Sequence, residues 1–195
     1  MAIDETLRSV LTEVALECGA DRAAVIPCSE IVTDATFRGM CASNACGMYG
    51  RCWTCPPHVG EIDALMASLS EYEFVLVYQR IGTLEDSYDF EGMQKAKRAH
   101  YGVSQKLRRA FAHFAHLRTL HLGAGGCGVC DVCAARTGEP CRFPTQAMAS
   151  LEAYGVNVSK MAASAGMRYI NGVNTVTYFG AVFFSLTENG GDQNG

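Results

Sequence analysis

Eight of the ten cysteines fall into two short groups, and this clustering limits what the chain can fold into. The first group is Cys41, Cys46, Cys52 and Cys55, and the second is Cys127, Cys130, Cys133 and Cys141. Cysteine makes up about 5% of the 195 residues, less than in small domains that disulfides hold together. With 49% hydrophobic residues, the chain can bury a core without such cross-links. The clustered thiols therefore indicate metal ligands or redox groups.

The net charge, the absence of a long apolar run and the N-terminal residues disfavour several classes of protein. The net charge is −4 and the isoelectric point is near 5.7, which disfavours a globally basic nucleic-acid binder. No apolar run approaches the roughly 20 residues that a membrane span needs. Asp4 and Glu5 stand where a secretory signal peptide carries positive charge. We therefore expect a soluble, cytoplasmic protein whose compartment keeps its thiols reduced.

Hydrophobic periodicity predicts a mixed fold. Apolar residues at helical spacing mark segments near 3–18, 61–69, 91–117 and 145–165, with a break at Gly155 that divides the last segment into two pieces. Runs of β-branched and aromatic residues mark strands at 23–26, 74–78, 117–122 and within 173–186. These elements predict an α/β fold class, with α+β as the alternative, in which helices flank a central sheet. We expect a single domain over residues 1–188, with cysteine loops at 41–57 and 125–144, and a disordered tail at 189–195.

The spacing of the second group is typical of an iron–sulfur site. Two residues separate each of Cys127, Cys130 and Cys133, and Cys141 follows after seven residues in a Cys-Arg-Phe-Pro sequence. Such a loop can place three sulfurs at corners of a cubic cluster, and a more distant cysteine near proline supplies the fourth corner. Structural zinc more often uses two separated Cys-x2-Cys pairs. A [4Fe–4S] cluster is the predicted occupant, with zinc and free thiols as the alternatives.

The first group is less diagnostic. Cys52 and Cys55 form a Cys-x2-Cys pair that Pro56 follows, as proline follows the last ligand of a ferredoxin. The earlier gaps of four and five residues match no common zinc or ferredoxin pattern. We predict a second iron–sulfur site here, against a zinc site or a catalytic dithiol.

Two other patterns have simpler interpretations. Glycines at 123, 125, 126 and 128 spell G-x-G-x-x-G, but no acidic residue ends a following strand about 20 positions on, as dinucleotide binding requires. Backbone N–H groups at these glycines are instead expected to approach cluster sulfides. Basic residues between Lys95 and Arg109 line one face of a helix, which is more typical of a solvated face than of a docking site.

The stretch from Cys41 to Gly60, CASNACGMYGRCWTCPPHVG, resembles the signature of a prokaryotic family of predicted metal-binding proteins of unknown function. The resemblance continues over nearly the whole chain, through 122–127, Cys130, Cys133, 141–144, 150–155 and 174–180. It implies a cytosolic metal protein, of iron–sulfur type, found largely in anaerobes and without an agreed reaction. Family members often lack cysteine at the position of Cys52, so the resemblance supports this ligand less than the other seven.

Together these patterns predict a protein that binds two [4Fe–4S] clusters through the eight grouped cysteines. It would act in electron transfer, as a carrier or a reductase component. The alternatives are a cluster-dependent enzyme with one iron open to substrate, and a zinc module that recognises a macromolecule. A redox partner protein is expected, without membrane or nucleic acid as a partner. The sequence leaves open whether the protein is an enzyme, and it is compatible with a homo-oligomer.

Overall fold

The computed structural model describes residues 3–187, and the predicted tail at 189–195 lies outside the described residues. The helices are α1 (Glu5–Glu17), α2 (Phe37–Ala42), α3 (Ile62–Leu69), α4 (Phe90–Phe111) and α5 (Val158–Ser164). The strands are β1 (Arg22–Pro27), β2 (Phe74–Thr83), β3 (Leu117–Leu122) and β4 (Thr175–Leu186). Short 3-10 helices lie at η1 (Cys28–Glu30), η2 (Ala134–Thr137) and η3 (Glu152–Tyr154). No helix between residues 3 and 187 is both long and apolar enough to cross a membrane.

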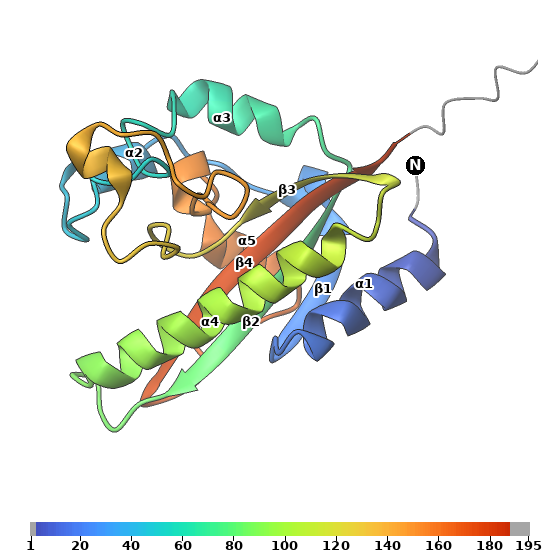
Figure 1. Ribbon diagram of the computed structural model, residues 1–195. Helices are drawn as coiled ribbons and strands as arrows, with labels where there is room; N and C mark the ends of the chain where they lie inside the picture. The colour runs from blue at the N-terminus through green and yellow to red at the C-terminus, as the bar shows by residue number, and fades with distance from the viewer. Residues whose placement is uncertain (1–2, 188–195) are drawn as a thin grey trace, which may run out of the picture.

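The strands form one sheet in the order β1-β2-β4-β3, and every neighbouring pair is antiparallel. β2 and β3 both run antiparallel to β4, so they are parallel to each other, and α4 connects them across the sheet (Figure 1). This arrangement confirms the predicted central sheet flanked by helices. Its antiparallel pairing is the one that the α+β alternative describes.

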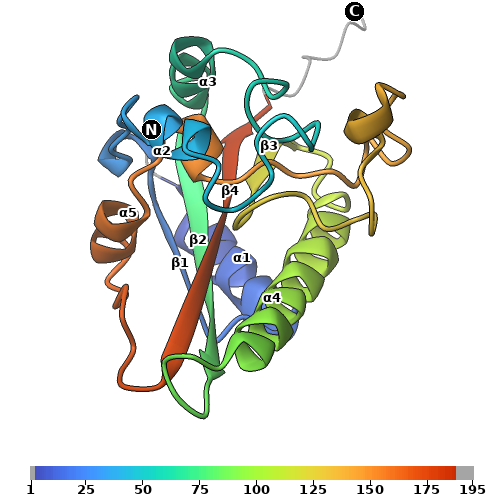
Figure 2. The ribbon, with the colours of Figure 1, turned by 90° about the vertical axis from the view of Figure 1, so that its left-hand side faces the viewer.

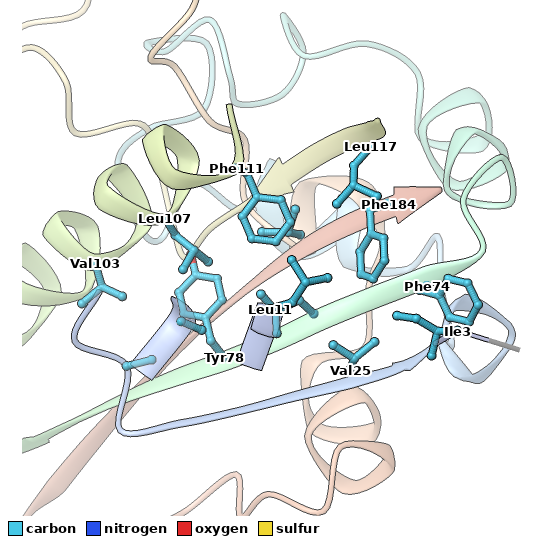
Figure 3. Packing of buried hydrophobic residues seen from close by; sticks show 14 residues of the cluster. Ile3, Leu11, Val25, Phe74, Tyr78, Val103, Leu107, Phe111, Leu117 and Phe184 are labelled. Carbon is cyan, nitrogen blue, oxygen red and sulfur yellow. The ribbon is translucent and has the colours of Figure 1, made fainter. Parts of the chain in front are cut away.

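Apolar layers cover both faces of the sheet. Phe74, Leu76 and Tyr78 of β2 pack against α1 and α4, whereas Val75 and Val77 face the opposite layer, which includes α5 (Figures 2 and 3). Side chains alternate between faces along a strand, and a strand covered on both sides therefore has a continuous apolar sequence. This explains why residues 74–78 predict a central strand correctly.

The segment 145–165 is helical in two pieces on either side of Gly155, as predicted, but its first part is not helical. Only η3 and α5 are helical within it, because residues before η3 pair with the end of β3 instead. The N–H of Gly123 donates to the carbonyl of Ala149 at 2.9 Å, and the N–H of Leu151 donates to the carbonyl of Gly123 at 3.0 Å. This pairing holds both ends of the second cysteine loop against the sheet. The long helix α4 also ends at Phe111, earlier than the predicted residue 117.

Candidate metal centre

Both cysteine loops lie at the same end of the molecule. The last turn of α2 and the loop after it carry the first group, and the loop between β3 and η3 carries the second (Figures 1 and 2). The described cysteines form no disulfide, and all ten are free thiols. The topology thus brings together two segments that are about 80 residues apart in the sequence.

The second group surrounds one small cavity. Cys127, Cys130, Cys133 and Cys141 all line it, and Cys52 of the first group lines it with them. The rest of the wall is formed mainly by apolar or aromatic side chains, from Trp53, Val129, Phe143 and Ala147. Five thiols therefore line one small cavity whose other walls are mainly apolar. Protein-bound clusters are held in surroundings of this kind.

Backbone N–H groups point at sulfurs in this cavity. The N–H groups of Val129 and Met148 hydrogen-bond to the thiol of Cys127, although burial has the larger effect and raises its pKa. The N–H of Cys127 in turn donates to the sulfur of Cys52. Such hydrogen bonds favour a thiolate over a thiol, and they tune clusters when iron is bound.

The first group occupies a tightly turned loop. Cys41 lies in the last turn of α2, Cys46 is exposed, and Cys52 and Cys55 are buried, with Cys52 at 0% exposure. A hydrogen bond between Cys52 and Cys55 lowers the pKa of Cys52 and raises that of Cys55. The charges of Cys46 and Cys41 also raise the pKa of Cys55, so these thiols are near enough to interact. The loop therefore brings all four thiols into one electrostatic group.

Direct contacts join the two loops. The indole Nε1 of Trp53 donates to the carbonyl of Glu139 at 2.9 Å. A Cβ placed on Gly126 would lie 3.1 Å from Met48 and 3.5 Å from the sulfur of Cys55, so a larger residue would require the Met48 side chain to shift. Gly126 thus lies where the second loop packs closely on the first.

The chain matches the model of a family described as predicted metal-binding protein (DUF2284) over residues 24–184. The chain belongs to this family. The matched range contains both cysteine groups, and it confirms the family resemblance of the sequence. No curated protein and no solved structure matches the chain.

In this member of the predicted metal-binding family, the thiols surround a space instead of meeting at a point. Within residues 3–187, no three histidine, cysteine, aspartate or glutamate side chains converge closely enough to hold a single metal ion. Four thiolates on one zinc ion would stand about 3.8 Å apart, since Zn–S bonds are about 2.3 Å long and tetrahedral. Thiolates on a four-iron cube stand farther apart, because each binds a different iron.

The two remaining cysteines lie away from both loops. Cys18 packs against the core between α1 and α4, as its place on an apolar helix face predicts. Cys28 donates to the carbonyl of Leu69 at 3.2 Å, and burial raises the pKa of its thiol to about 11. Neither belongs to the candidate centre of this family member.

Sequence spacing did not reveal two features of the site. Spacing assigns Cys52 only to Cys55, yet Cys52 also lines the cavity of the second group. The charge pattern predicts a solvated basic face on α4, yet Lys97 and Arg98 line a separate cavity beside Cys127. Both features depend on contacts between distant segments. The glycine loop after β3 leads to no α-helix before α5, so it lacks the helix N-terminus of a dinucleotide site.

Proposed function

We propose that the protein binds two [4Fe–4S] clusters and transfers electrons, as a carrier or as a component of a reductase. The second site would use Cys127, Cys130, Cys133 and Cys141, and the first would use Cys41, Cys46, Cys52 and Cys55. The observation that carries the proposal is the cavity that all four cysteines of the second group line. A donor set made only of thiols suits iron–sulfur clusters and zinc, and does not suit magnesium or calcium.

The spacing of the second group favours a cluster over zinc. Three cysteines separated by two residues each suit three corners of a cube, whereas structural zinc more often uses two separated Cys-x2-Cys pairs. The backbone N–H groups of Cys127, Val129 and Met148 already point at sulfurs, as they do around protein-bound clusters. When bound, iron–sulfur clusters accept and donate single electrons.

The chain's own residues would support this chemistry in two ways. Trp53 and Phe143 line the cavity and would limit the access of water to a bound cluster, and solvent exposure is one factor that sets cluster potential. The close packing of Gly126 near Met48 and Cys55 and the hydrogen bond from Cys127 to Cys52 keep the two sites adjacent. Adjacent redox sites suit the passage of electrons through the protein. A separate redox partner protein would then supply or remove them.

A second candidate function is a cluster-dependent enzyme. Cys52 lines the cavity of the second group, which already has four cysteines of its own. If Cys52 does not ligate iron, the first site has three protein ligands, and one iron is open to a small molecule, much as catalytic zinc keeps an open position.

The test is anaerobic purification with iron, zinc and acid-labile sulfide measured per chain. Two complete cysteine quartets predict about eight iron and eight sulfide. Stoichiometric zinc without sulfide would contradict the proposal and favour the zinc module. About four iron and four sulfide would restrict the proposal to the second site.

A further inference from the structure

A cavity of about 470 Å³ lies between α4 and the glycine loop that follows β3. One wall is the α4 face that carries Lys97, His100 and Tyr101, and the other is the backbone from Gly123 to Gly128, with Met148 and Ala149. Cys127 forms part of its edge. Pockets for small organic molecules have volumes of about 300–1,000 Å³, so this cavity has the size of a ligand site.

The wall on α4 is cationic. Lys97 is half-buried and Arg98 is exposed, and neither makes an ion pair with any residue in the described range 3–187. A Cβ on Gly125 would lie 3.5 Å from the Nζ atom of Lys97, so the ammonium group lies directly over the glycine loop. An ammonium group that is partly removed from water, without a carboxylate partner, favours an anion in the cavity.

A buried histidine provides a second, independent observation. His100 lines the cavity and is 2% exposed, and its Nε2 faces the Oγ of Ser104 at 3.5 Å. Among the described residues, Nδ1 on the other side of the ring has no hydrogen-bond partner. Ser104 bonds in turn to the hydroxyl of Tyr78 at 2.6 Å, which fixes the serine within the core. A buried polar atom without a partner is rare in proteins, and a bound ligand would satisfy it.

The rest of the lining is apolar. Ala124, Met148 and Ala149 contribute side chains, and the ring of Tyr101 lies against Gly128, whose Cβ would be 3.7 Å from it. Apolar lining with a few placed polar groups is typical of sites for small organic molecules. It would not suit a fully hydrated inorganic ion alone.

We propose that this cavity binds a small organic anion, a carboxylate or a phosphate monoester with an apolar body. Lys97 holds the acidic group above Gly125, the apolar body lies against Tyr101 and Met148, and the buried His100 hydrogen-bonds to a polar atom of the ligand. None of these contacts involves a metal, so the inference goes beyond the proposed electron transfer and does not rest on it. The edge at Cys127 places the bound molecule beside the second cysteine group.

Calorimetric titration of the anaerobically purified protein tests this site. The probes are phenyl phosphate and phenylacetate, with neutral 2-phenylethanol as a control of similar size. We expect at least one anion to bind with a Kd of about 0.1–1 mM and the neutral probe to bind much more weakly. The anion that binds more tightly shows whether the site prefers a phosphate or a carboxylate group.

Two variants and one control variant locate the binding. Lys97→Gln should weaken the affinity for the anion about tenfold. Lys95→Gln makes the same change on a part of α4 outside this cavity, and it should weaken the affinity less than about twofold. Gly123→Val should abolish binding by filling space, because a Cβ there meets no atom within 4 Å. Melting temperature and iron content check that each variant is folded.

Two outcomes would overturn the proposal. In one, neither anion binds below about 10 mM. In the other, Lys95→Gln and Lys97→Gln weaken binding equally, so that the attraction is non-specific. Iron and sulfide are measured on the same samples. A sample without iron that binds the anion would contradict the proposed function alone, and a fully loaded sample that binds neither anion would contradict this inference alone.

Discussion

At the scale of single residues, Cys52 determines how the centre can work. It is fully buried, it hydrogen-bonds to Cys55, and its sulfur accepts the N–H of Cys127. A thiol that is hydrogen-bonded from both loops is held in place whether or not it binds iron. We expect it to close the first site, because a buried cysteine that two residues separate from Cys55 is well placed to bind the same cluster.

Cys52→Ser should therefore retain a cluster at the first site, with an altered reduction potential and a new sensitivity to small ligands such as cyanide. The weaker oxygen ligand leaves one iron easier to reach, whereas four thiolates close the cube. Electron paramagnetic resonance with and without added ligand measures both changes. Cys18→Ser, which replaces a cysteine outside both groups, should behave as wild type.

If the wild-type protein already binds such ligands at iron, and Cys52→Ser behaves identically, Cys52 is not a ligand of the first site. The carrier function would then be replaced by the cluster-dependent enzyme. The sequence could not decide this point. Its spacing pairs Cys52 with Cys55 along the chain, but only the fold brings Cys52 to Cys127, about 75 residues further on.

At the scale of elements, the second cysteine loop has little structure of its own. Between β3 and η3 its regular structure is the single turn of η2, and Ala134 is the buried residue of that turn. Its ends are fixed by the pairing of Gly123 with Ala149 and Leu151. On the proposed function, a loop with so few apolar contacts would depend on bound metal for much of its folding free energy.

Cys130→Ala should consequently lose about half of the iron and sulfide. It should also lower the melting temperature by on the order of 10 °C, because metal binding to a loop contributes to folding. Metal analysis and calorimetry on the anaerobic protein measure the two effects. Cys18→Ala serves as the matched control, since it also removes one thiol. Full iron with an unchanged melting temperature would show that the second cluster is wrongly assigned.

The hydrophobic pattern correctly predicts the helices and strands that do not depend on pairing with a distant loop. The strand at 117–122 is observed with the predicted bounds, and apolar periodicity places α1 and α3 within two residues of their observed ends. The prediction of a helix was wrong for the first part of the segment 145–165, because residues there pair with Gly123, which is distant in the sequence. The spacing of apolar residues alone cannot distinguish a helix from a segment that pairs with a distant part of the chain.

At the scale of the whole molecule, a buried polar chain connects the core with the cavities near the cysteine loops. The hydroxyl of Tyr78 lies 2.6 Å from Ser104 and 2.8 Å from Nε2 of His121, and His100 stacks on the ring of Tyr78. Burial lowers the pKa of His100 to about 4 and that of His121 to about 3. Both imidazoles are thus neutral in the folded protein at pH 7, because burial makes their protonation unfavourable.

These histidines should make the fold sensitive to mild acid. His100 has a pKa of about 4 when folded and about 6.5 when unfolded, so the unfolded chain binds more protons between these values. The free energy of unfolding therefore falls as the pH falls from about 6.5 towards 4, by up to about 3 kcal/mol from this group. Above pH 6.5 the histidine contributes no pH dependence.

The variant His100→Asn removes this titration, so its apparent unfolding midpoint should decline less than that of wild type between pH 7 and pH 4.5. Acid also affects bound metal, but it does so in both proteins, and the difference between their midpoints isolates the histidine. His113→Asn, which replaces an exposed histidine just beyond α4, should follow the wild-type profile. Parallel declines for wild type and His100→Asn would mean that His100 is charged without cost, which its burial against Tyr78 and Ser104 does not allow.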